Sequence, residues 1–290
     1  MSYKRRDFIK LSVQSAAAIA LLQMGCNSAN NPKTVTNTID KFGLQLYTLR
    51  DDMPKDPRGI LKQIAGFGYK QIESYEGGQG MFWGMGHKGF KQYMDDLGMS
   101  IVSSHCDMDR DFERKAAEAA EIGMKYLICP FLGKQKTMDD YKRYADTFNK
   151  KGEVCRKNGI RFAYHNHDYS FEKLDGVFPQ DVMMDITNPD TVDYEMDIYW
   201  VVAANEDPEA WAKKYKNRFR LCHVKDRAKG ATGGDASVNL GTGGIDFSKI
   251  LKSIKNNGME YFIVEQEKYE GTTPLEAVKA NAAYMKTLKV

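Results

Sequence analysis

Short apolar runs alternate with helical patterns from residue 42 to the end of the chain. Most runs are rich in β-branched or aromatic residues and almost continuously apolar, which is typical of strands covered on both faces. Eight runs predict strands: Phe42–Thr48, Tyr69–Tyr75, Met99–His105, Tyr126–Phe131, Ile160–His165, Val192–Asp197, Phe219–Val224 and Tyr261–Gln266.

The segments between these runs carry helix start and stop signals. Asp56 followed by Pro57 predicts an N-cap, and Thr273 with Glu276 predicts a capping box. Several helical patterns end at a glycine just before the next apolar run. Eight strand–helix alternations over about 250 residues predict a (β/α)₈ barrel, with an open doubly wound sheet as the alternative.

The first 40 residues do not share this pattern. Residues 1–26 join a basic start to the apolar stretch Leu11–Leu22, which predicts an export signal too short to span a bilayer comfortably. Arg5-Arg6 followed by Phe-Ile-Lys resembles a twin-arginine signal. Residues 27–40 are predicted to be a flexible tether and 41–290 a single barrel domain.

Cys26 follows Leu-Leu-Gln-Met-Gly and resembles the lipid-attachment cysteine of bacterial lipoproteins, although Gln23 stands where Leu is usual. The alternative is plain signal-peptidase cleavage near Cys26. We therefore expect a periplasmic protein or a lipoprotein anchored to the membrane through Cys26.

Composition narrows the function classes. Hydrophobic residues make up 42% and charged residues 28% of the chain, as in an ordinary globular enzyme. The net charge is +3 with both signs interspersed, and no basic patch interleaved with aromatic residues predicts nucleic-acid binding.

Four of the predicted strands end at a residue whose side chain commonly binds metal ions. His165, Asp197, His223 and Glu265 close the fifth to eighth strands. Side chains at the carboxyl ends of consecutive barrel strands converge, so these four groups are expected to meet. Two imidazoles and two carboxylates suit one divalent ion, Mn, Zn, Co or Fe rather than Ca. The alternative is four unrelated polar residues at strand ends.

Several short motifs together resemble the xylose-isomerase-like family of sugar isomerases and epimerases, whose relatives include inosose dehydratase and endonuclease IV-type barrels. They are Gly68-Tyr69-Lys70-Gln71-Ile72-Glu73, His165-Asn166-His167-Asp168, His223-Val224-Lys225-Asp226, Leu240-Gly241-Thr242-Gly243-Gly244-Ile245-Asp246-Phe247 and Val264-Glu265. The resemblance covers the chain from about residue 42 onward and implies a TIM barrel with a metal at the four strand-end groups.

The chain also departs from the family pattern. Family members commonly have Glu at the position of His165, and often His at that of Trp200. The family's epimerases exchange protons through two metal-bound glutamates on opposite faces of the substrate. Here Glu265 is the one such carboxylate left, which places a two-glutamate epimerisation in doubt.

The resemblance still implies proton abstraction next to a carbonyl through a metal-stabilised enediolate. Glu265 is the first candidate base and His167 the second, and Lys225 is a candidate for holding the developing oxyanion unless it is paired with Asp226. Candidate substrate-binding residues are Glu73, His105, Trp200 and Trp83. For Trp200, packing in the core is the alternative to stacking on a sugar.

We therefore expect a metal-dependent sugar isomerase or epimerase. The alternative is a lyase that removes the proton next to the ketone of a 3-keto-glycoside and expels the anomeric group. A sugar-binding lipoprotein without turnover is a third hypothesis. A DNA-repair nuclease is a fourth, and export together with the few basic surface runs argues against it.

Overall fold

The computed structural model describes residues 38–290, and Thr38–Val290 form one compact unit. The predicted export signal and Cys26 lie outside the described residues, as does most of the predicted tether. Among the residues described, no helix combines the length and hydropathy needed to cross a bilayer.

Eight parallel strands close into a barrel in the order β1-β10-β7-β6-β5-β4-β3-β2, which confirms the predicted (β/α)₈ fold. Each barrel strand falls within one of the eight apolar runs. They are β1 (Gly43–Gln45), β2 (Gln71–Tyr75), β3 (Ser100–His105), β4 (Tyr126–Cys129), β5 (Arg161–His165), β6 (Val192–Asp197), β7 (Phe219–Val224) and β10 (Tyr261–Val264).

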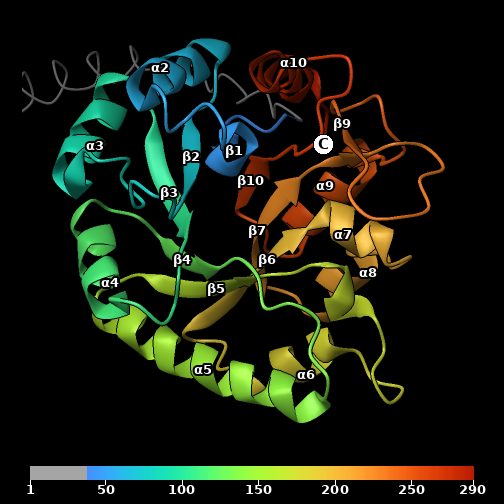
Figure 1. Cartoon of the computed structure of the whole chain (residues 1–290). Coiled ribbons are helices and arrows are strands. Elements are labelled where there is room, and N and C mark those ends of the chain that lie inside the picture. The colour runs from blue at the N-terminus through green and yellow to red at the C-terminus, as the bar shows by residue number, and fades with distance from the viewer. Residues whose placement is uncertain (1–37) are drawn as a thin grey trace, which may run out of the picture. The chain divides into compact units, whose positions relative to one another are not determined.

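Helices surround the strands, as Figure 1 shows. They are α2 (Pro57–Phe67), α3 (Gly86–Asp96), α4 (Phe112–Glu121), α5 (Met138–Lys157), α6 (Pro179–Ile186), α7 (Ile198–Ala203), α8 (Pro208–Lys214), α9 (Phe247–Asn256) and α10 (Pro274–Thr287), with 3₁₀ helices η1 (Leu46–Leu49) and η2 (Asp168–Phe171). Asp56 caps α2, and Thr273 forms the predicted capping box with Glu276 at α10.

One glycine shows how closely these layers approach. A Cβ at Gly152 of α5 would lie 2.8 Å from Thr191 Oγ1 and 2.9 Å from Val192 Cγ2, at the start of β6. A larger residue would push the longest helix off the barrel wall.

The barrel interior changes character along its axis. Around the middle of the strands it is filled by an apolar cluster: Val102, Tyr126, Ile128, Ala163, Leu221 and Ile263. Nearer the carboxyl ends the interior is ionisable, and Glu73, Glu195 and His223 are fully buried there. This polar zone lies where barrel enzymes place their chemistry.

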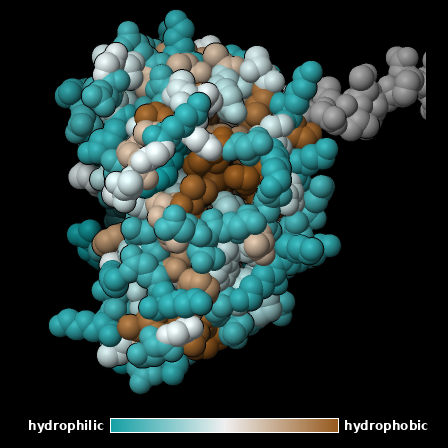
Figure 2. Space-filling view, turned by 90° about the vertical axis from the view of Figure 1, so that its right-hand side faces the viewer, coloured by the Kyte–Doolittle hydropathy of each residue, from teal (hydrophilic) through white to brown (hydrophobic). Residues whose placement is uncertain are grey.

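Two of the segments that follow barrel strands contain additional secondary structure. The segment after β5 contains η2 and α6, and the segment after β7 contains the antiparallel pair β8 (Asp226–Arg227) and β9 (Ser237–Val238). On the side of the molecule where α7, α8 and β9 lie in Figure 1, the surface is hollowed, and hydrophobic side chains line part of the hollow (Figure 2).

Candidate metal centre and active site

Strand β6 places acidic side chains at several depths inside the barrel. Successive side chains of a strand alternate between its faces, so Asp193, Glu195 and Asp197 share the inner face. Asp193 accepts hydrogen bonds from Tyr126 and Arg161. Glu195 and Asp197 belong to two groups of side chains, an inner and an outer cluster, which meet at His223.

The outer cluster consists of the four groups at the strand ends. His165 Nε2 lies 3.4 Å from Asp197 Oδ2, and His223 Nδ1 lies 3.7 Å from the same oxygen. His223 Nδ1 also lies 3.1 Å from Glu265 Oε2. All four side chains are buried. The barrel therefore brings together the groups that the sequence predicted as metal ligands.

Hydrogen bonds on the far sides of these groups fix which atoms face inward. His165 Nδ1 lies 3.0 Å from the carbonyl of Pro130, which can only accept, so Nδ1 carries the proton. Asp197 Oδ1 accepts from the backbone N–H of Tyr199 at the start of α7. A lone pair of His165 Nε2 and the free oxygen of Asp197 are thereby turned toward each other.

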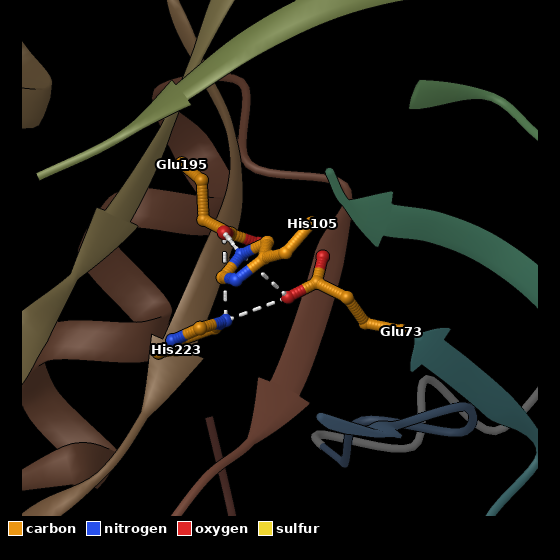
Figure 3. A group of neighbouring side chains, drawn as sticks. All are labelled: Glu73, His105, Glu195 and His223. Carbon is orange, nitrogen blue, oxygen red and sulfur yellow. Dashed lines mark hydrogen bonds and ion pairs between the residues drawn. The ribbon is translucent and has the colours of Figure 1, made fainter. Parts of the chain in front are cut away.

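The inner cluster lies on the other side of the His223 ring, and Figure 3 shows its four side chains converging. His223 Nε2 lies 2.8 Å from Glu73 Oε1 and 3.4 Å from Glu195 Oε2. His105 Nε2 lies 2.8 Å from Glu195 Oε2 and 3.2 Å from Glu73 Oε1. Glu73 also accepts from Gln45 and Ser103. By residue type, this cluster is a second candidate metal site.

The donor chemistry distinguishes the two clusters. Both ring nitrogens of His223 face carboxylates, and His165 Nε2 faces only Asp197. Without a cation, the outer cluster needs both imidazoles protonated. With a cation, they would serve as neutral ligands through Nδ1 of His223 and Nε2 of His165. In the inner cluster, one proton on each Nε2 gives both imidazoles a carboxylate acceptor, while Glu195 Oε1 is buried without a hydrogen-bond partner within residues 38–290. The residues present therefore fit a divalent ion in the outer cluster, with Glu73 and Glu195 orienting His223 from behind.

The charges in the outer cluster shift each other's pKa. Burial alone would raise the pKa of Glu265, but His223 and Lys225 lower it to about 2. Burial would likewise raise the pKa of Asp197, and Lys225, His165 and His223 lower it. Burial would lower the pKa of His223, but Glu195 and Glu265 raise it well above its usual value. The site therefore holds its carboxylates ionised.

In the inner cluster the two carboxyl groups behave oppositely. Burial and the neighbouring Glu73 raise the pKa of Glu195. Burial would also raise the pKa of Glu73, but His105 and His223 hold it well below its usual value. Burial would lower the pKa of His105, but Glu73 and Glu195 raise it to about 9. Glu73 is thus the stronger permanent charge behind His223.

Lys225 is fully buried and pairs with Glu265, at 3.6 Å, and with Glu267. Burial would lower its pKa, but Glu265, Asp197 and Glu267 raise it, so the ammonium group stays charged. The alternative partner considered from the sequence, Asp226, accepts instead from the backbone N–H groups of the glycine-rich loop at Gly241, Gly243 and Ile245.

That hydrogen bonding shapes the loop at 240–247. A Cβ at Gly243 would lie 2.2 Å from Asp226 Oδ1, so only glycine allows the backbone this close to the carboxylate. The loop is therefore a turn built on Asp226.

His167 lies beside the outer cluster, with its ring centroid 4.8 Å from that of His165. It is partly exposed, and its Nδ1 has no hydrogen-bond partner within residues 38–290. Burial and the neighbouring His165 lower the pKa of His167 to about 2, which keeps the ring neutral. Trp200 is partly exposed, and its ring centroid lies 5.3 Å from that of His167.

The other residues predicted to bind substrate lie deeper. Glu73 has no exposed surface, and all its hydrogen bonds are to protein groups. His105 is 8% exposed and forms part of the inner cluster. Trp83 is 3% exposed and donates to Ser74 Oγ. These positions favour packing and orienting roles, and substrate binding by these residues stays a prediction.

Glu195 is the one member of the two clusters that the sequence analysis did not single out. It lies two residues before Asp197 on the inner face of β6. The alternation of Asp193, Glu195 and Asp197 along the strand is the sequence pattern that indicates its inward position.

A family model described as "Xylose isomerase-like TIM barrel" matches residues 61–288. The chain belongs to this family. Among curated relatives, the xylose isomerase-like chain is similar to an inosose dehydratase of Clostridium perfringens, with 31% identity over 49% of this chain and 53% of that protein. An inosose dehydratase of Lacticaseibacillus casei is 28% identical over 45% of this chain and 48% of that protein. The chain thus spans about half the length of the curated relatives it matches.

The solved structures match a larger share of this xylose isomerase-like chain than the curated relatives do. A sugar phosphate isomerase/epimerase from Parabacteroides distasonis is 29% identical, covers 87% of this chain and 96% of its own, and has a TM-score of 0.73. The IOLI protein, solved with a bound zinc atom, is 14% identical with a TM-score of 0.68 over 84% of this chain and 96% of its own. At that identity the second match shows the shared fold alone.

Proposed function

We propose that this xylose isomerase-like protein is a metal-dependent lyase acting on a ring-shaped keto-sugar. The base removes the proton on the carbon next to the ketone, and the C–H electron pair forms a carbon–carbon double bond. The bond to the group on the following carbon breaks, and that group leaves with its electron pair and takes up a proton. In a 3-keto-glycoside the proton comes from C2 and the anomeric group leaves.

The observation that carries this proposal is that the outer cluster contains one glutamate. Glu265 is the one glutamate there, Asp197 is tied to α7, and the other two groups are imidazoles. Removal of a proton from one side suits an elimination, whereas epimerisation needs acid–base groups on two faces. The curated relatives are named as dehydratases, and dehydration is also an elimination.

A divalent ion held by His165, Asp197, His223 and Glu265 would polarise substrate oxygens and stabilise negative charge next to the carbonyl. The side chains supply the proton transfers. Glu265 is engaged by His223 and Lys225, whereas His167 is partly exposed and its buried Nδ1 has no hydrogen-bond partner within residues 38–290. His167 and Glu265 are therefore both candidate proton acceptors. Lys225 keeps Glu265 ionised and adds positive charge beside the site.

The test is to incubate the metal-loaded protein in D₂O with a 3-keto-glycoside and with a ketose, and to follow both by NMR. Release of the anomeric group supports the lyase. Deuterium exchange or ketose conversion with no release would refute it. His167→Asn is expected to lose turnover while keeping its metal, whereas Glu265→Gln is expected to lose both.

The second candidate is a sugar isomerase or epimerase. It is favoured by the Parabacteroides distasonis structure, which matches over nearly its whole length and is described as a sugar phosphate isomerase/epimerase. The same NMR experiment distinguishes the candidates, because an epimerase inverts a centre without releasing a group.

A further inference from the structure

We infer that the mouth of the barrel beside His167 carries a binding subsite for a flat apolar group, namely the group that leaves in the proposed reaction. The inference rests on the proposed function and extends it to a substrate class: glycosides whose aglycone is aromatic. Its main residue is Phe131, which immediately follows the carboxyl end of β4 and Pro130.

Phe131 is unusually exposed for its type. Within residues 38–290, four large hydrophobic side chains are exposed, and Phe131, at 60%, is the most exposed of them. Ligand sites combine aromatic side chains with a few placed polar groups, and Phe131 lies beside such polar groups. Burying a phenylalanine ring removes apolar surface from water, so a ligand that covers Phe131 gains affinity.

The backbone on both sides of Phe131 is held by hydrogen bonds. The carbonyl of Pro130 accepts from His165 Nδ1 at 3.0 Å, and the N–H of Leu132 donates to Tyr169 Oη at 3.0 Å. The Phe131 ring itself meets His167 edge-on, with centroids 5.0 Å apart, and Tyr169 at 5.7 Å. The exposed ring is therefore fixed by the same segment that orients a metal-ligand histidine.

Its distance from the outer cluster suits the group beyond the reacting sugar. Centroid separations of 5.0 Å from Phe131 to His167 and 4.8 Å from His167 to His165 place the Phe131 and His165 rings within about 10 Å. A sugar ring bound beside the cluster would therefore bring its substituent within reach of Phe131.

Trp200 adds a second aromatic ring on His167, at 5.3 Å, and Lys225 Nζ lies 5.1 Å from the Trp200 ring. Phe131 and Trp200 thus both pack on His167, a candidate proton acceptor. Aromatic rings pair favourably with one another, and such a pair adds affinity beyond that of the area it buries. An aromatic aglycone is the substituent that uses this arrangement best.

The experiment compares the 3-keto forms of phenyl β-glucoside and methyl β-glucoside. The wild type is expected to prefer the phenyl substrate in kcat/KM by about tenfold or more. Phe131→Ala is expected to reduce this preference by about tenfold, mainly through KM, and Phe131→Leu to reduce it less. Ile186→Ala, which alters an exposed hydrophobic residue at the end of α6, is the matched control and leaves the preference unchanged.

Binding of unoxidised phenyl β-glucoside, which has no ketone and cannot react, separates this inference from the proposed function. If neither keto-substrate is cleaved but Phe131→Ala weakens binding of the phenyl glucoside, the lyase proposal fails and the subsite stands. The subsite is refuted if the wild type shows no phenyl preference in cleavage or binding, or if Phe131→Ala affects both substrates equally. It is also refuted if Phe131→Ala changes only the oligomeric state in sedimentation, because the ring would then serve contact between copies.

Discussion

Replacing Glu73 by Gln is expected to perturb metal binding without replacing a predicted metal ligand. Glu73 Oε1 accepts from His223 Nε2 at 2.8 Å and from Gln45 Nε2 at 2.7 Å, and Glu73 Oε2 accepts from Ser103 Oγ. The amide of Gln has one oxygen for these donors and presents N–H groups where the second oxygen was. At least one buried donor is left unsatisfied, and the charge behind His223 is lost.

The expected size follows from that contact. A hydrogen bond to a charged group contributes about 1.5–3 kcal/mol, and loss of a partner that orients a metal ligand typically lowers metal affinity about 10–100-fold. We expect Glu73→Gln to lie in that range and to remain folded. The assay titrates the metal-free protein with Zn²⁺ against a chromophoric chelator, with thermal unfolding measured in parallel.

Asp193→Asn is the matched control for this experiment. Asp193 is a buried carboxylate on β6 that pairs with Arg161 and Tyr126. The bonds of Asp193 go to Arg161 and Tyr126, outside both clusters. Its loss is therefore expected to destabilise the barrel while leaving Zn²⁺ affinity within about threefold, a change well under 1.4 kcal/mol. The reasoning is refuted if Glu73→Gln binds Zn²⁺ as the wild type does, or if both variants lose affinity equally.

Three further predictions follow from the same contacts. Removing the metal with EDTA is expected to lower Tm by about 5–10 °C, because a ligand at 100 times its Kd stabilises by about 2.7 kcal/mol; an unchanged Tm would argue against a bound metal. Lys225→Met leaves Glu265 and Glu267 without their buried cation and is expected to cost about 3–5 kcal/mol in urea unfolding, while a loss below 1 kcal/mol would contradict the pairing. Asp226→Ala removes the acceptor of the loop at 240–247, so hydrogen exchange of the Gly241 and Gly243 amides is expected to accelerate, and unchanged protection would contradict this role.

The fold was predictable because most of the strands lie in short runs rich in β-branched or aromatic residues and because the helix signals act locally. Asp56 and Thr273 cap the helices that their spacing predicts, and the eight runs contain the eight barrel strands. The convergence of the strand-end residues then follows from closure of the barrel.

The inner cluster was harder to predict, because it depends on depth within the barrel. Glu195 lies one layer below Asp197 on the same face of β6, and Glu73 reaches His223 from the far side of the barrel, 150 residues away in sequence. His223 contributes one ring nitrogen to each cluster. This depends on the orientation of its ring, which no local sequence pattern specifies. Trp83 likewise lies in a loop by sequence, yet packs against Tyr75 with its ring almost buried.

The most direct test of the metal centre is a crystal structure of the protein loaded with Mn²⁺ or Zn²⁺, with an anomalous difference map recorded at the metal's absorption edge. We predict one peak bounded by His165 Nε2, Asp197 Oδ2, His223 Nδ1 and the Glu265 carboxylate, at about 2.0–2.2 Å from each ligand atom for Zn²⁺. A peak on the other side of the His223 ring, among Glu73, His105 and Glu195, would contradict the account, as would a map with no peak in the barrel.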